Sequence, residues 1–226
     1  LYINKHYPFS NILAMVSPLK KVIGYRLLVI SVIIFLTYHL SPITYHQAYA
    51  QFSKYVRVAI VQDVSSLRLK VKGSFELVDS VSNKVLKRGK DLNTTVTVYS
   101  GGILLGNTKS KTDKLFIKPY YPESVIINGR IFRGDIKLIK NNMKLSVINH
   151  IDLEDYVKGI SVRETSHYWP IDSLKAEVIV FRAFALYKMQ ENSQKDFDLT
   201  SDVYSQGYGG RAAERYRINK AVDETR

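Results

Sequence analysis

The chain has 226 residues, of which 46% are hydrophobic and 23% charged, and it carries a formal net charge of +13. This composition excludes a disordered chain and is typical of a globular protein with a buried core. The absence of cysteine excludes disulfides, thiolate zinc sites and cysteine nucleophiles.

The first 50 residues have the layout of an export signal. Three basic residues up to Arg26 precede the apolar run 27–36, and a small-x-small site ends at Ala50. Because about 20 apolar residues are needed to cross a membrane, we expect export with cleavage near Ala50, and an uncleaved membrane anchor is the alternative. After residue 50 the chain still holds 29 basic and 20 acidic residues. In an exported protein, this positive charge favours binding to the anionic cell envelope. The alternatives are that the charge serves binding to nucleic acid or only keeps the protein soluble.

Residues 51–148 are expected to form a β-rich part. Apolar and polar residues alternate along short runs, as in half-buried antiparallel strands. The expected strands are 56–61, 67–73, 95–100, 115–119, 124–132 and 143–149, with seven or so in total. The turn signals between them are 82–84, 100–102, Asn128-Gly129 and Asn141-Asn142, of which Asn-Gly is the strongest hairpin signal.

Residues 149–226 are expected to form the helical part of the fold. Asp152 is the predicted N-cap of a short helix and Gly159 its predicted C-terminal stop. A second helix over 170–190 carries one apolar stripe. The residues of this stripe are Leu174, Val178, Phe181, Ala185 and Met189. Because the run 178–187 is apolar on all sides, we expect the helix to be largely buried. Strands followed by helices predict the α+β class, with a β-rich part before a helical catalytic part.

Few types of catalytic site can be built from the side chains that follow the export signal. Only His150 and His167 follow the signal, which leaves little for a Ser-His-Asp triad or a multi-histidine metal site. His167 lies three residues from Glu164, as in a metal-binding pair, but a third ligand is not evident. The glycine-rich segment 205–210 lacks the Lys-Ser/Thr ending of a phosphate-binding loop. We interpret it as a substrate loop.

Glu164 and Arg182 are the two residues whose setting is unusual. Glu164 is either a solvated acid, as most loop glutamates are, or a general acid whose pKa is raised by an apolar wall of Tyr168 and Trp169. Arg182 interrupts the apolar helical run, so its guanidinium either reaches the surface or needs a partner. We expect that partner to be a neighbouring acid, a loop carbonyl or the substrate, because a tight pair with Glu164 would keep that acid ionised.

Three segments resemble the stage II sporulation protein D family, which includes the amidase enhancers. They are "LEDYVKGISVRETSHYWPIDSLKAEVIVFRAFAL", "SQGYGG" and "NGRIFRG", and the likeness runs in order over about 56–226. The resemblance implies a lytic transglycosylase that cleaves peptidoglycan glycan strands from which an amidase has removed the stem peptides. It places Glu164 on the catalytic glutamate and Arg182 on the arginine of the central helix.

The resemblance also assigns residues to the substrate. It implies a glycan groove lined by Ser205, Gln206, Tyr208, Gly209 and Gly210. Tyr168 and Trp169 either stack on sugar faces or belong to the core. One carboxyl group suffices for this reaction, because the C6 hydroxyl of muramic acid replaces the second carboxylate of ordinary glycosidases. No cofactor is implied.

The chain departs from the family pattern at several positions. Ala183 and Phe184 stand where family members carry Thr-Tyr, and Thr165 stands where an apolar residue is common. The segment before Ser205 lacks the cysteines and histidine that bind zinc in some members, so we predict no metal. The ending at Arg226 resembles a truncated catalytic domain. The rival function is a non-catalytic wall-binding protein that recruits or stimulates an amidase, and a nucleic-acid binder is a third possibility that export would exclude.

Overall fold

The computed structural model describes residues 55–120, 122, 124–164, 166–202 and 204–226, with only the backbone of residues 161–164. The predicted export signal over residues 1–50 lies outside the described residues. Within the described part of the chain, none of the helices combines the length and the hydropathy that a membrane crossing requires.

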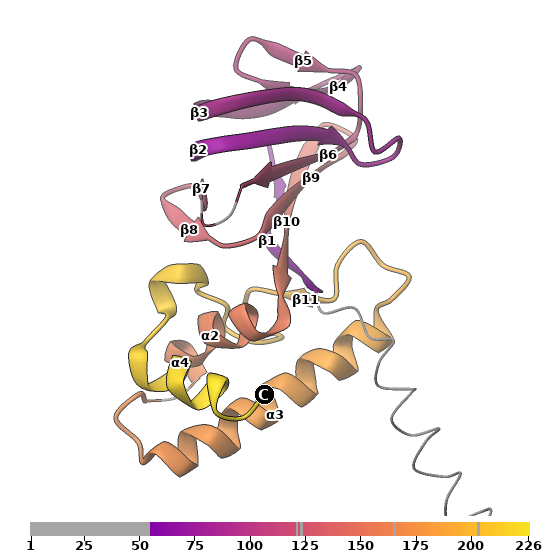
Figure 1. Cartoon of the computed structure of the whole chain (residues 1–226). Helices are drawn as coiled ribbons and strands as arrows, with labels where there is room; N and C mark the ends of the chain where they lie inside the picture. Colours follow the sequence, from indigo (N-terminus) through magenta and orange to yellow (C-terminus); the bar gives the residue numbers. More distant parts are fainter. Residues whose placement is uncertain (1–54, 121, 123, 165, 203) are drawn as a thin grey trace, which may run out of the picture. The chain divides into compact units, whose positions relative to one another are not determined.

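The described strands form one eleven-stranded sheet, in the order β11-β1-β10-β9-β6-β2-β3-β4-β5, with β7 paired to β2 and β8 (Figure 1). The strands are β1 (Tyr55–Val64), β2 (Ser66–Asp79), β3 (Val85–Tyr99), β4 (Gly102–Leu105), β5 (Thr108–Ser110), β6 (Lys114–Pro119), β7 (Val125–Ile127), β8 (Arg130–Phe132), β9 (Asp135–Asn141), β10 (Lys144–Asp152) and β11 (Leu199–Thr200). Neighbouring strands are antiparallel except for the parallel pair β1 and β11.

The described residues contain more strands than the expected seven or so. The first half of β3 was not predicted, because residues 85–93 hold mostly polar side chains and show no apolar alternation. These residues become a strand by pairing with β2, whose own alternation is regular. Strand β9 was also missed. Pairing with β2, which lies outside any local window, decided the first half of β3. The alternation of Ile136 and Leu138 in β9, by contrast, was visible in the local sequence.

The predicted turns are confirmed where the backbone needs a positive φ. Asn128 and Gly129 have φ values of 48° and 83° between β7 and β8, as a two-residue hairpin turn requires. Asn142, with φ of 54°, closes the hairpin between β9 and β10. The Asn-Gly and Asn-Asn signals therefore fixed these two registers locally.

The helices are α2 (Leu153–Glu164), α3 (Ile171–Glu191) and α4 (Tyr216–Asp223), with a short 3₁₀ helix η1 (Gly210–Ala213). Asp152 is confirmed as the cap of α2, since its Oδ1 accepts hydrogen bonds from the backbone N–H groups of Glu154 and Asp155 at 2.9 and 3.4 Å. The prediction that Gly159 ends this helix is wrong, because α2 continues to Glu164. The reason is a tertiary contact of Gly159, described below.

Helix α3 has one buried stripe and one exposed apolar face. Leu174, Val178, Ala185 and Met189 are buried, as the stripe predicts, and Phe181 is half-buried. The expectation that the helix is largely buried is wrong, because Ile179, Val180 and Tyr187 are 51, 63 and 58% exposed. A helical run that is apolar on all sides does not show how many of its faces will be covered by other elements.

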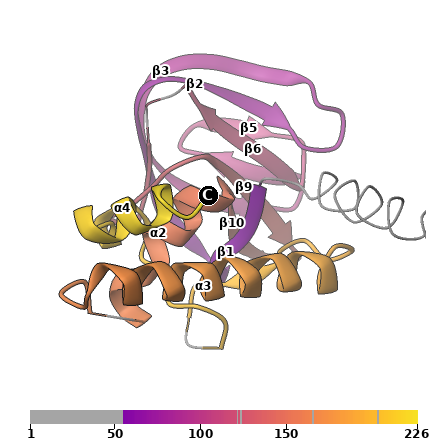
Figure 2. The same cartoon turned by 60° about the horizontal axis from the view of Figure 1, so that its bottom comes forward.

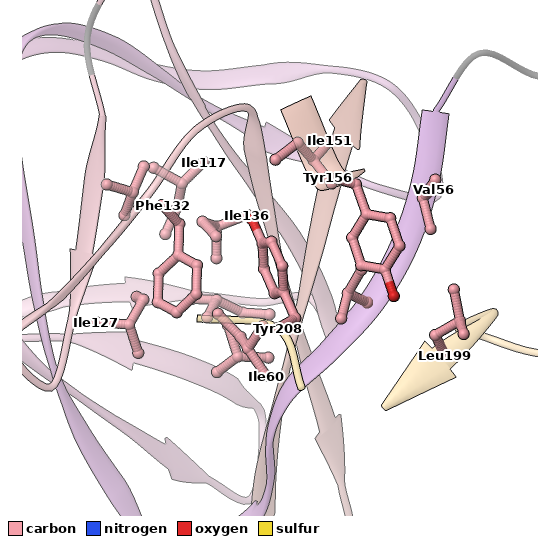
Figure 3. Close-up of a cluster of buried hydrophobic side chains, with 14 of the residues drawn as sticks. Val56, Ile60, Ile117, Ile127, Phe132, Ile136, Ile151, Tyr156, Leu199 and Tyr208 are labelled. Carbon is pink, nitrogen blue, oxygen red and sulfur yellow. The ribbon is translucent and has the colours of Figure 1, made fainter. Parts of the chain in front are cut away.

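Sheet and helices share one core. The strand β11, which follows α3 in the chain, pairs with β1, and β10 continues without a break through residues 148 and 149 into the cap of α2. Figure 2 shows α3 running beneath the sheet, beside β1. In Figure 3, Tyr156 of α2 and Tyr208 of the later loop lie among strand residues such as Phe132 and Ile136. The α+β class is confirmed.

Candidate functional site

Tyr208 is the point at which the three characteristic segments meet. Its side chain is fully buried, and its hydroxyl donates a 2.8 Å hydrogen bond to Oδ1 of Asn149, which is itself buried. The Asn149 amide donates in turn to the backbone carbonyls of Arg133 and Asp135 at 2.8 and 3.1 Å. Burial raises the pKa of Tyr208, so the hydroxyl stays a donor.

The segment "NGRIFRG" holds the loop that carries Tyr208. Arg130 donates a 2.8 Å hydrogen bond to the backbone carbonyl of Tyr208, and the ring of Phe132 lies 5.9 Å from the Tyr208 ring, centroid to centroid. Arg133 makes a two-point pair with Glu214, at 2.6 and 2.9 Å, just beyond η1. This segment therefore joins the strands to the chain that follows the loop.

Gly159 is the contact of α2 with the same loop. A Cβ at this position would lie 2.6 Å from Cε2 of Tyr208, and the Gly159 carbonyl accepts a 2.9 Å hydrogen bond from the N–H of Gly209. Tyr156, one turn earlier, donates from its hydroxyl to Oε1 of Gln206 at 2.9 Å. The glycine is in the helix because a tyrosine ring and a backbone pass directly over it.

The loop residues predicted to bind substrate are largely turned inward. Gln206 and Tyr208 are 6 and 0% exposed, and Gly210 is buried with a φ of 68°. Half-buried Ser205 accepts a 3.1 Å hydrogen bond from the N–H of Thr200 in β11. These contacts give the loop a structural part in the fold, and its substrate-binding role stays a prediction.

Glu164 is the last residue of α2, so this loop and α2 together fix where its backbone lies. The turn after it presents two aromatic side chains to solvent, since Tyr168 and Trp169 are 78 and 50% exposed. Arg217 of α4 holds this turn by a 2.7 Å hydrogen bond to the Trp169 carbonyl. Neither ring belongs to the core, so the alternative that Tyr168 and Trp169 are core residues is excluded.

Arg182 pairs with an acid, as its place in an apolar helical run requires. Its Nε and Nη2 donate to the two carboxylate oxygens of Glu154 in α2, at 2.8 and 2.7 Å. Its guanidinium also donates to the backbone carbonyls of Val222, in the last turn of α4, and of Thr225, just after α4, at 3.5 and 3.3 Å. The expectation of a neighbouring acid and carbonyls is confirmed, and Arg182 links α2, α3 and the end of α4.

Two adjoining cavities lie beside the start of α2. The larger, of about 500 Å³, is lined by Asp152, Leu153, Glu154, Asp155, Arg182 and Arg226. The smaller, of about 290 Å³, shares Asp152 and Asp155 and also reaches Arg133 and Asp135. Burial raises the pKa of both Asp135 and Asp155. The mixture of acidic and basic walls suits a polar ligand rich in hydrogen-bonding groups.

Sequence reasoning missed three residues of this region. Glu154 was not singled out, because it lies 28 residues from Arg182 and no local pattern indicates that the two form a pair. Arg217 and Tyr216 lie near the chain's end in a polar stretch, and only the fold brings Arg217 to the Trp169 turn. Tyr216, beside Arg217, is 82% exposed and adds a third exposed ring to this side of α4.

Comparison with known proteins finds a family match in the last part of the chain. Residues 141–226 match the model of a family described as SpoIID, stage II sporulation protein, and this match associates the chain with sporulation and the cell wall. An uncharacterized protein of Brachyspira hyodysenteriae is 35% identical over 101 residues, which are 44% of this chain and 27% of that protein. The chain thus spans about a quarter of this relative. No solved structure matches the chain.

The family match covers α2, the turn after Glu164, α3, the Tyr208 loop and α4, which are the elements that meet at the candidate site. Residues 141–226, less than half of the chain, therefore match the stage II sporulation protein (SpoIID) family.

Proposed function

We propose that the chain is an exported lytic transglycosylase that cleaves peptidoglycan glycan strands freed of their stem peptides. In this reaction Glu164 protonates the glycosidic oxygen as the bond to C1 of muramic acid breaks. The resulting carboxylate then removes the proton of the C6 hydroxyl, whose oxygen bonds to C1 and gives a 1,6-anhydro end. Glu164 ends the cycle protonated, and no water is consumed.

The observation that carries the proposal is the position of Glu164 at the end of α2. The backbone of Glu164 ends α2 directly before the turn that carries Tyr168 and Trp169. The exposed rings of Tyr168 and Trp169 follow at once, and flat aromatic rings offer an apolar surface to the faces of sugar rings. Acid and aromatic platform are thus joined by one short turn.

Arg182 has a positioning role in this proposal. Its bidentate pair with Glu154 fixes α3 against α2, the helix that presents Glu164. Arg182 therefore acts through the helices, and we assign it no contact with the reacting bond.

The test measures 1,6-anhydromuramic ends by mass spectrometry after incubation with stem-peptide-free glycan strands. Glu164→Gln should lower the rate at least about 100-fold, because loss of a general acid–base group costs 10²–10⁴. Glu191→Gln is the matched control, since Glu191 is a surface acid paired with Lys188 at the far end of α3. Equal rates for Glu164→Gln and wild type would refute the role of Glu164.

A second candidate, a non-catalytic protein that recruits or stimulates an amidase, is favoured by one observation. Ile179, Val180 and Tyr187 lie on the same face of α3 and are each at least half exposed, together with exposed Ala183. Exposed apolar patches often mark protein interaction sites. Glycan binding without any anhydro product, combined with faster release of stem peptides by an added amidase, would support this candidate over the enzyme.

A further inference from the structure

The positive charge of the described fold is concentrated in one segment. Residues 55–226 hold 28 basic and 20 acidic residues, and residues 66–111 alone hold nine basic and three acidic. This cationic segment, which runs from β2 to just after β5, therefore carries six of the eight net charges. The remaining 126 residues of that range are close to neutral.

Strand β2 displays three of these cations in a row on its exposed face. Arg68, Lys70 and Lys72 are exposed, while the alternate residues are buried. The buried residues are Leu67, Leu69 and Val71, which are 3, 0 and 1% exposed. Alternate residues of a strand are about 6.6–6.8 Å apart, so the three charges form a linear row. Opposite Arg68 and Lys70 on β3 lie neutral Thr95 and Asn93, which leave the charges unopposed.

The cations of this segment differ from those of the helical part in how they are paired. In the helical part, Lys158, Lys175 and Arg182 each make an ion pair with an acid of another element. In the cationic segment, Arg88 paired with Glu76 is the one ion pair among the described residues. The segment's other two acids are engaged by backbone, since Asp79 accepts from Val81 and Ser82, and Asp91 from Gly73.

The segment is also separate from the candidate catalytic region. Strands β3, β4 and β5 form one end of the sheet order, and β11, which follows α3, forms the other. Figure 1 shows β2 to β5 at the top, away from α2, α3 and α4. A ligand held on β2 and β3 would therefore have to be long to reach the end of α2.

We propose that the cationic segment binds the stem-peptide-free glycan strand as a linear polyanion at a distance from Glu164. This inference rests on the proposed function. Once its stem peptide is removed, each muramic acid exposes a lactyl carboxylate, so the strand is a long chain of negative charges. Lysine suits such a ligand, because its compact charge attracts anions without demanding one fixed geometry. The attraction acts at long range and weakens with salt.

The experiment measures binding of end-labelled, stem-peptide-free glycan strands by fluorescence anisotropy in the Glu164→Gln background, in which cleavage is expected to be at least about 100-fold slower. Lys70→Gln/Lys72→Gln should weaken binding about tenfold or more at low salt and flatten its salt dependence. The control, Lys144→Gln/Lys195→Gln, removes two exposed cations outside the segment that make no ion pair among the described residues. It should bind nearly as tightly as the parent. A urea unfolding curve checks that both variants remain folded.

Three results would overturn the proposal. Unchanged binding in Lys70→Gln/Lys72→Gln would remove the segment from the interface, and an equal loss in the control would reduce the effect to net charge. Stronger competition by single-stranded DNA than by unlabelled glycan of equal length would identify nucleic acid as the partner instead. Failure of the catalytic proposal appears separately, as absence of anhydro product from the chain with Glu164 intact.

Discussion

At the scale of single residues, the partner of Arg182 decides how its burial is tolerated. The side chains of Arg182 and Glu154 are 15 and 18% exposed, so both charges are largely removed from water and each depends on the other. The guanidinium also serves the carbonyls of Thr225 and Val222, which one ammonium group cannot do at the same time.

We therefore predict that Arg182→Lys lowers the free energy of unfolding by about 1–3 kcal/mol, although the charge is kept. Urea denaturation of both proteins measures the difference. Arg88→Lys is the matched control, because the Arg88 side chain is 71% exposed and its pair with Glu76 contributes little. Equal effects of the two substitutions would mean that the bidentate geometry at Glu154 is not what stabilises the helices.

At the scale of elements, α2 shows tertiary packing overruling local propensity. Glycine inside a helix costs about 1 kcal/mol relative to alanine, yet Gly159 lies in the middle of α2. The space that an alanine methyl group needs is occupied by the Tyr208 ring, and the ring is held from the other side by the Tyr208 bond to Asn149.

Gly159→Ala is accordingly expected to destabilise the fold by about 1–3 kcal/mol, because the cost of overpacking exceeds the gain in helix propensity. The midpoint of urea unfolding reports the change. In a Tyr208→Leu background the ring is gone, so the same substitution should cost much less or become stabilising. An equal cost in both backgrounds would show that Tyr208 is not the obstacle.

At the scale of the whole molecule, the two faces of the sheet differ in electrostatics. His150 of β10 lies on the face opposite Asn149, with its ring 4.8 Å from that of Phe116 and its Nε2 buried without a described partner. Burial, followed by the nearby charges of Lys137, Arg57 and Lys118, lowers the pKa of His150 to about 4. The fold therefore holds this histidine neutral.

This shift makes stability fall on acidification. Between about pH 6.5 and 4 the unfolded chain binds a proton at this histidine that the folded chain does not, so the free energy of unfolding decreases as pH falls through this window. The expected loss from pH 7 to about pH 5 is about 2 kcal/mol. Asp135 and Asp155, whose pKa values are raised by burial, act in the opposite direction, since the folded state binds their protons more tightly.

Urea unfolding at several pH values, compared between wild type and His150→Phe, isolates the contribution of this histidine. The variant should lose most of the pH dependence between pH 7 and 5. The control His167→Gln should keep it, because His167 lies in the turn after α2 and its side chain is only partly buried. A His150→Phe variant as acid-sensitive as wild type would refute the assignment.

The sequence by itself determined the α+β class, the Asn-Gly and Asn-Asn turns, the cap at Asp152 and the buried stripe of α3, because each depends on residues a few positions apart. Its likeness to a family also predicts Glu164 as the catalytic acid, and this stays a prediction. The tertiary structure alone decided that β3 extends along β2, that α2 passes through Gly159, that half of α3 is exposed and that Glu154 pairs with Arg182. It also separated the cationic segment from the helices. These features depend on tertiary contacts between segments that are far apart in the sequence, and local sequence patterns do not specify such contacts.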